Sequence, residues 1–142
     1  RDLVRATQAA LDAGVAACRA GGCLSDIGAA IQEVADALQY ETVRKYCGHG
    51  IAEAFHIPPL VQHFRNDTRM VLHPGMIFTI EPMLVEGSQE SLIWNDGWNV
   101  VTVDGGRAAQ FEHTILITDS DQPEILTVNP DDTTTKKPQQ KT

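Results

Sequence analysis

Residues 1–40 carry apolar side chains at the three- and four-residue steps of amphipathic helices. The first such series is Leu3, Val4, Thr7, Leu11, Val15 and Cys18, and it ends before two consecutive glycines. Ser25 then offers an N-cap for a second helix. The apolar stripe of that helix would be Ile27, Ile31, Val34 and Leu38. The pattern predicts a helix pair at the start of the chain.

Beyond Tyr40 the helical period is replaced by short β-prone segments that alternate with turn residues. Two prolines at 58–59 exclude a helix there, and the turn at 73–75 leads into a strand at 76–80. The turns at 95–97 and 104–106 predict two successive hairpins, joining 92–94 to 98–103 and then 98–103 to 110–118. We therefore expect an α+β fold, with a helix pair followed by antiparallel strands and hairpins.

The chain has 142 residues, 42% of them hydrophobic, which is enough for one domain with one core. We assign this domain to residues 1–128. From Asn129 to Thr142 the chain is almost entirely Asp, Thr, Lys, Pro and Gln, and this polar composition predicts a disordered tail.

The net charge of −8 and the absence of clustered lysines and arginines argue against a nucleic-acid partner or an anionic membrane surface. No apolar stretch is long enough to cross a membrane, and no signal peptide is evident, so we expect a soluble protein. The three cysteines form no Cys-x-x-Cys pair, so we expect reduced thiols, with Cys18 and Cys47 packed in the core.

Three short strings each place one potential metal ligand in a constrained backbone. His49 lies between two glycines, Glu81 precedes a proline, and Glu112 lies inside the apolar-rich run 108–118. A carboxylate in such a run is costly to bury unless a cation compensates its charge. One imidazole and two carboxylates converging on a cation would meet that need.

Strand alternation allows both glutamates to point into one pocket, because Thr79 shares a face with Glu81 and Gln110 shares a face with Glu112. The alternative for each residue alone is ordinary: a single histidine is more often structural than a ligand, and a strand glutamate is more often solvated. Histidines also recur at 49, 56 and 63, but the prolines between them break any helical register, so we interpret this spacing as coincidental.

One imidazole nitrogen with carboxylate oxygens favours a divalent ion such as Mn, Fe, Co or Zn. Such an ion suits hydrolysis, because it activates water and polarises a carbonyl. Three protein ligands suffice for one ion with an open position, but they are too few for two ions.

Six motifs resemble, in order and spacing, the type I methionine aminopeptidases of the pita-bread metallopeptidase fold. They are Gly48–Ile51, Phe55–His56, Pro74–Met76, Phe78–Met83, Asp96–Trp98 and Ala109–Thr114. The helix pair, which includes Ile27–Gln32, is also similar to that family, and the similarity covers residues 1 to about 128.

By this resemblance His49, Glu81 and Glu112 would be metal ligands in a family site that holds two ions. Glu112 would bridge the ions, and Glu81 would also shuttle a proton as a catalytic residue. The metal is not specified by the resemblance, so Co, Mn, Fe and Zn all stay open.

The resemblance also implies substrate-binding roles. His56 would contact the scissile peptide as a catalytic residue, and Gln110 would orient Glu112 or the substrate. Phe55 and Trp98 would wall the pocket for the methionine side chain. Ordinary core packing is the alternative for both aromatic residues.

The sequence departs from the family in two respects. Ala52 stands where the family usually has glycine, and the two aspartate ligands and further histidine that the family carries before the first helix have no counterpart in this sequence. We therefore expect an incomplete pita-bread fold, at most one weakly held ion, and little or no activity by this chain alone. Another chain supplying the missing N-terminal half is one candidate partner.

The function that the resemblance implies is removal of the N-terminal initiator methionine from nascent proteins and peptides, in the cytoplasm and in association with ribosomes. Two alternatives stay open. A proline-directed peptidase of the same fold shares the glutamate strings, although the motifs Gly48–Ile51 and Asp96–Trp98 favour the methionine enzyme. A non-catalytic pita-bread module that binds other proteins is the second.

Overall fold

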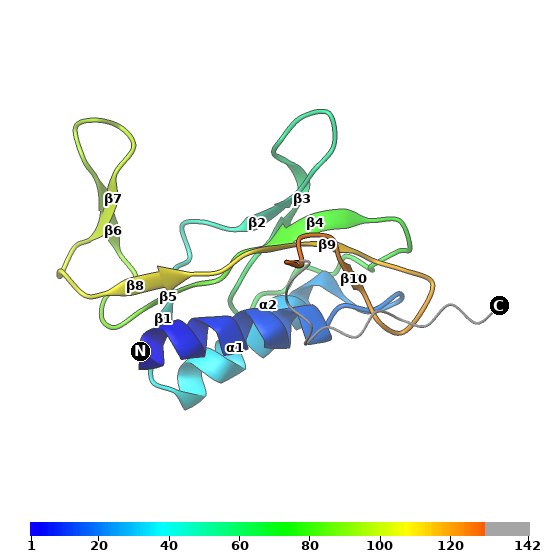
Figure 1. The fold of residues 1–142 in the computed structure, drawn as a ribbon, viewed down its shortest axis with the longest axis horizontal. Helices are drawn as coiled ribbons and strands as arrows, with labels where there is room; N and C mark the ends of the chain where they lie inside the picture. Colours follow the sequence, from blue (N-terminus) through cyan, green and yellow to red (C-terminus); the bar gives the residue numbers. More distant parts are fainter. Residues whose placement is uncertain (130–142) are drawn as a thin grey trace.

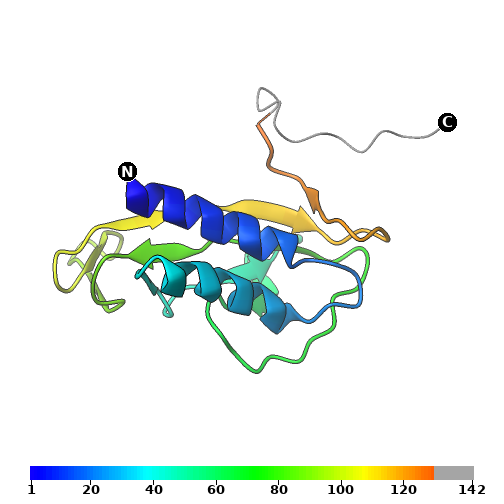
Figure 2. The ribbon, with the colours of Figure 1, turned by 90° about the horizontal axis from the view of Figure 1, so that it is seen from below.

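Two antiparallel helices, α1 (Asp2–Ala16) and α2 (Leu24–Ala37), begin the fold in a computed structural model that describes residues 1–129. They lie side by side, as the helical periodicity predicts (Figures 1 and 2). Leu11, Ile27 and Ile31 are almost completely buried where the helices meet the sheets. Burying each such side chain stabilises the fold by about 1.5–3 kcal/mol.

Two details of the predicted helices are wrong. The N-cap of α2 is Cys23, whose backbone N–H donates to the Asp26 carboxylate at 3.1 Å, and Ser25 already lies inside the helix. The apolar stripes are also narrower than expected, because Val4 and Leu38 are about half exposed. The local capping box between Cys23 and Asp26, together with the bridge from Cys23 to Val71, marks where the helix begins.

The strands form two antiparallel sheets and a separate hairpin. The larger sheet has the order β10-β9-β4-β2-β3 and the smaller one the order β1-β5-β8. Their bounds are β1 Glu41–Thr42, β2 Gly48–Gly50, β3 Ile57–Val61, β4 Ile77–Ile80, β5 Met83–Val85, β8 Ala108–Gln110, β9 His113–Leu116 and β10 Glu124–Ile125. This arrangement confirms the α+β prediction.

One of the two predicted hairpins forms and the other does not. Strands β6 (Ser91–Ile93) and β7 (Val100–Thr102) pair around the turn at 95–97, as expected. Strand β7 does not continue into a second hairpin, because β8 pairs with β5 and β9 pairs with β4 and β10. The second hairpin prediction is therefore wrong.

The helices cover one face of the sheets, with α1 against β4, β5 and β8 and α2 against β1 and β3. The β6–β7 hairpin and the loop between β2 and β3 project on the opposite side, well apart from each other (Figure 1). The core between the layers includes Leu11, Ile31, Phe78, Ile80 and Ile115. The open side of the sheets, between the two projections, therefore faces away from the helices.

The predicted tail at 129–142 lies outside the described residues except for Asn129. Within residues 1–129 no helix combines the length and apolar character needed to cross a bilayer. All three cysteines are free thiols. Cys18 is fully buried as predicted, whereas Cys47 is only partly buried.

Candidate metal-binding site

The two glycines beside His49 allow β2 to lie unusually close to its neighbours. A Cβ atom on Gly48 would lie 2.1 Å from the carbonyl oxygen of Thr79 on β4. A Cβ atom on Gly50 would lie 2.4 Å from the carbonyl oxygen of Pro58 on β3. Such separations are far below van der Waals contact, so only glycine fits at either position. The Gly-His-Gly string thus permits the tight packing that places His49 between two strands.

His49 is a buried residue whose ring has a defined tautomer. Its backbone N–H donates to Thr79 Oγ1 at 2.9 Å, and its Nδ1 lies 3.0 Å from the carbonyl oxygen of Gly50. Because a carbonyl oxygen only accepts, Nδ1 carries the proton in the neutral ring. The lone pair of Nε2 is therefore free, and Nε2 lies 3.6 Å from Glu81 Oε1.

Glu81 follows β4 directly and is held at both its backbone and its side chain. Its N–H donates to His63 Nε2 at 3.1 Å, and Thr79 Oγ1 donates to its Oε1 at 2.9 Å. Burial raises the pKa of the Glu81 carboxyl above its ordinary value, which the Thr79 hydrogen bond opposes and the charge of Glu112 reinforces. The Glu81 carboxyl therefore holds its proton to a higher pH than a fully solvated glutamate does.

Sequence reasoning assigned no role to two residues of this site. Thr79 is almost fully buried, and its hydroxyl links the His49 backbone to the Glu81 carboxylate. His63 is completely buried, and burial lowers its pKa to about 4, so its ring is neutral at pH 7. Thr79 shares a strand face with Glu81, which is a usable signal, whereas no local pattern points to His63.

Glu112 does not occupy the buried position that its apolar neighbourhood predicts. It lies between β8 and β9 and is exposed, with Gln110 Nε2 3.5 Å from its Oε2. Because Ile80 pairs with His113 across β4 and β9, the next residues along that register are Glu81 and Glu112. Glu112 therefore faces the site from its rim, which explains its influence on the pKa of Glu81.

His56 and Phe55 gather around the ring of His49 on the loop between β2 and β3. The centroid of the His49 ring lies 4.2 Å from that of His56 and 5.5 Å from that of Phe55. Trp98 lies in the turn of the β6–β7 hairpin, away from this loop (Figure 1). Phe55 is 65% exposed and Trp98 is 85% exposed, so the alternative of core packing is wrong for both.

The pair of His49 and Glu81 fits a divalent cation. Ligand nitrogens and oxygens lie about 2.0–2.2 Å from an ion such as zinc, so two ligand atoms 3.6 Å apart can share one ion. Among residues 1–129, however, no group of three or more His, Cys, Asp or Glu side chains is placed to hold a metal ion.

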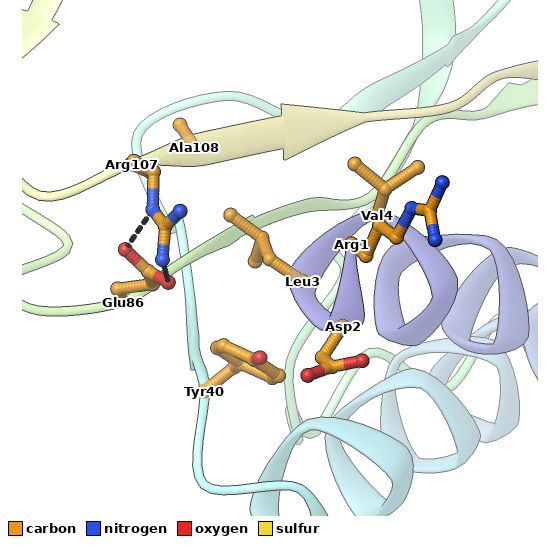
Figure 3. Close-up of a pocket in the computed structure, with 8 residues that line it drawn as sticks. All are labelled: Arg1, Asp2, Leu3, Val4, Tyr40, Glu86, Arg107 and Ala108. Atoms are coloured by element: carbon orange, nitrogen blue, oxygen red, sulfur yellow. Dashed lines mark hydrogen bonds and ion pairs between the residues drawn. The ribbon is translucent and has the colours of Figure 1, made fainter.

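A separate cleft of the described residues lies away from this site. It has a volume of about 350 Å³ and lies at the start of α1, where Arg107 forms a bidentate ion pair with Glu86 (Figure 3). Leu3 and Tyr40 also line it. None of the residues expected to bind metal or substrate lines this cleft, so it does not bear on the site around His49.

Comparison with known proteins identifies the family. The sequence profile of metallopeptidase family M24 matches residues 1–119. The chain belongs to this family. Family membership confirms the resemblance drawn from the six motifs, and it supports a dependence on divalent metal, since M24 is a family of metallopeptidases.

Individual M24 relatives are methionine aminopeptidases. That of Escherichia coli K12 is 47% identical over 132 residues, which is 92% of this chain and 50% of the relative. The crystal structure of the Thermotoga maritima enzyme has a TM-score of 0.86 and 40% identity, covering 90% of this chain and 51% of that one. The chain thus spans about half the length of these relatives and has the fold of their matching half.

A more distant structural neighbour, the prolidase of Pyrococcus furiosus, has a TM-score of 0.69 with 21% identity. The matched region covers 91% of this chain and 32% of the prolidase. This likeness shows the fold alone.

Proposed function

We propose that this chain contributes metal-binding and substrate-binding residues to a methionine aminopeptidase, which removes the N-terminal methionine from nascent proteins and peptides. The observation that carries the proposal is the placement of His49 Nε2 3.6 Å from Glu81 Oε1, in an M24 chain that is 47% identical to a methionine aminopeptidase. A proline-directed enzyme is less well supported, because the prolidase likeness is only 21% identical.

In this proposal His49, Glu81 and Glu112 are the protein ligands that this chain offers. A bound divalent ion, Co, Mn, Fe or Zn, would supply Lewis acidity toward the scissile carbonyl. Glu81 also holds or releases a proton at its carboxylate, a role that its raised pKa favours. Glu112 would bridge to a second ion in a complete site.

The remaining residues act on the peptide. His56, which stands against the His49 ring, would donate a hydrogen bond to the scissile peptide. Phe55 would offer an exposed aromatic surface to the methionine side chain, and the exposed Trp98, which lies apart from it on the β6–β7 hairpin, would be the second aromatic wall of the pocket. Gln110, 3.5 Å from Glu112, would hold that carboxylate in orientation.

The number of ligands limits what the chain does alone. Because no three-ligand group forms among residues 1–129, we propose that donors outside this chain, from a further segment or another chain, complete the site. The 142-residue chain by itself would then bind at most one ion weakly and turn over little substrate. A cytoplasmic setting, where thiols stay reduced, suits its three free cysteines, and association with ribosomes would bring it to nascent chains.

Calorimetric titration of the 142-residue chain with Mn²⁺ or Co²⁺ tests the ligand assignment. His49→Ala and Glu81→Gln should abolish binding, whereas the exposed His73→Ala should retain it. Equal binding by the unmodified chain and all three variants would contradict the assignment of His49 and Glu81 as metal ligands.

Hydrolysis of a Met-Gly peptide against an Ala-Pro peptide tests the substrate. We expect preference for the methionyl peptide once further ligands complete the site. Robust turnover by the isolated chain would contradict the need for those ligands, and preference for the prolyl peptide would contradict the methionine assignment.

A further inference from the structure

His63 is a buried polar residue that the proposed function does not use. It follows β3 in the loop at 62–68 and has no exposed surface. Buried polar side chains in proteins are almost always hydrogen-bonded, so the partners of this ring indicate what it does.

The ring accepts one hydrogen bond and leaves one atom without a partner. The N–H of Glu81 donates to His63 Nε2 at 3.1 Å, so the proton of the neutral ring is on Nδ1. Among the described residues His63 Nδ1 has no hydrogen-bond partner. An apolar ring of the same size would fill this space without burying an unpaired N–H. What histidine adds here is therefore the acceptor for Glu81.

The backbone around His63 is held against α2. A Cβ atom on Gly28 would lie 2.5 Å from the carbonyl oxygen of Gln62 and 2.3 Å from that of Phe64. The backbone carbonyls of Gln62 and Phe64 thus pack directly against α2 at Gly28, and the His63 ring between them extends toward the end of β4. The acceptor is therefore fixed relative to the core rather than placed on a free loop.

Glu81 needs such a support because the strand ladder ends just before it. The pairing between β4 and β9 stops at Ile80, and Pro82 has no N–H to donate. The hydrogen bond to His63 fixes the backbone of Glu81, and the hydrogen bond from Thr79 fixes its carboxylate. Together they direct Oε1 toward the ring of His49.

We propose that His63 is a positioning residue that fixes the Glu81 backbone so that the carboxylate faces His49 Nε2. Its contribution to metal affinity rests on the proposed function, whereas its contribution to the placement of Glu81 does not.

The test compares His63→Phe, which keeps the ring shape and removes the acceptor, with His63→Gln, which returns an acceptor oxygen. In the ¹⁵N-labelled 142-residue chain we expect a scalar coupling across the hydrogen bond between the Glu81 nitrogen and His63 Nε2. Hydrogen exchange of the Glu81 amide should accelerate about tenfold in His63→Phe, the change expected for loss of one hydrogen bond, and less in His63→Gln. Hydrogen exchange of the β4 amides serves as the control, because it would accelerate only if the substitution destabilised the fold in general.

Titration with Mn²⁺ gives the second readout. Affinity should fall about tenfold or more in His63→Phe, as for loss of a residue that orients a ligand, and His63→Gln should recover much of it. The exposed His73→Phe is the matched control.

Three results would decide between the possibilities. Absence of the scalar coupling in the unmodified chain would overturn the proposal, and this measurement does not require any variant to fold. The proposal would also be overturned if each variant accelerated hydrogen exchange at the Glu81 amide and at the β4 amides by the same factor. Selective exchange at Glu81 with no Mn²⁺ binding by any protein would uphold the positioning role and contradict the proposed function instead.

Discussion

Replacing Thr79 by valine removes one hydroxyl while keeping the shape of the side chain. That hydroxyl accepts the backbone N–H of His49 and donates to the carboxylate of Glu81, both at 2.9 Å. Thr79 is only 2% exposed, so water cannot readily take its place. The substitution therefore leaves a buried donor unpaired and releases the Glu81 side chain.

The expected loss of unfolding free energy follows from these two bonds. An unpaired buried N–H costs about 1–3 kcal/mol, and a hydrogen bond to a charged group contributes about 1.5–3 kcal/mol. The side chain of Glu81 is 16% exposed, so water recovers part of the second amount. We expect Thr79→Val to lower the free energy of unfolding by about 2–4 kcal/mol, and a domain of ordinary stability stays folded after such a loss. Thr79→Ser keeps the hydroxyl and should lose only about 1 kcal/mol for one methyl group.

Urea unfolding followed by far-ultraviolet circular dichroism measures both variants. Tryptophan fluorescence is a poor probe here, because Trp94 and Trp98 are already 57% and 85% exposed in the folded chain. Equal stability of Thr79→Val and the unmodified chain would refute the reasoning. So would a loss in Thr79→Ser that matches the loss in Thr79→Val, since the methyl group and not the hydroxyl would then matter.

Three further predictions concern packing and ionisation. Gly48→Ala should lower the free energy of unfolding by about 3 kcal/mol or more, measured in urea, because its Cβ would lie 2.1 Å from the Thr79 carbonyl oxygen. A loss below about 1 kcal/mol would show that β2 and β4 separate freely. Burial raises the pKa of Cys18 from 9.0 to about 12, so the unfolded chain loses this proton first and stability falls as pH rises through that window. The unmodified chain should lose about 1.4 kcal/mol more than Cys18→Ala between pH 8 and pH 10, and parallel pH profiles would contradict this. Trp98→Ala should change the free energy of unfolding by less than about 0.5 kcal/mol, whereas Phe78→Ala in the core should lower it by about 3–5 kcal/mol. Similar losses in the two variants, measured by urea unfolding, would be inconsistent with the exposure of Trp98 on the hairpin.

Local sequence was sufficient wherever the structure depends on near neighbours. The helix pair follows from the spacing of residues such as Leu11 and Ile27, and the β6–β7 hairpin follows from its turn at 95–97. The glycines on either side of His49 also indicated a close approach, which the packing of β2 against Thr79 and Pro58 explains. For the helices and the hairpin the signal and the contact lie within one element or one turn, whereas the glycine signal is local but its contacts lie on the neighbouring strands β3 and β4.

Tertiary structure alone decided which distant segments meet. The turn at 104–106 resembles a hairpin turn, yet β8 pairs with β5 and β9 with β4, because each strand completes a sheet that covers the helices. Glu112 is exposed although its neighbours are apolar, since it lies in the break between these two strands.

The candidate site divides in the same way. The residue types in the strings at His49, Glu81 and Glu112 pointed to metal chemistry, because imidazole and carboxylate groups in constrained backbone are readable from sequence. The role of His63 was not readable, since it depends on a hydrogen bond to a residue 18 positions away and on the support of α2. Sequence determined which chemical groups are present, and the packing of helices against sheets decided which of them come together, because long-range contacts carry no local signature.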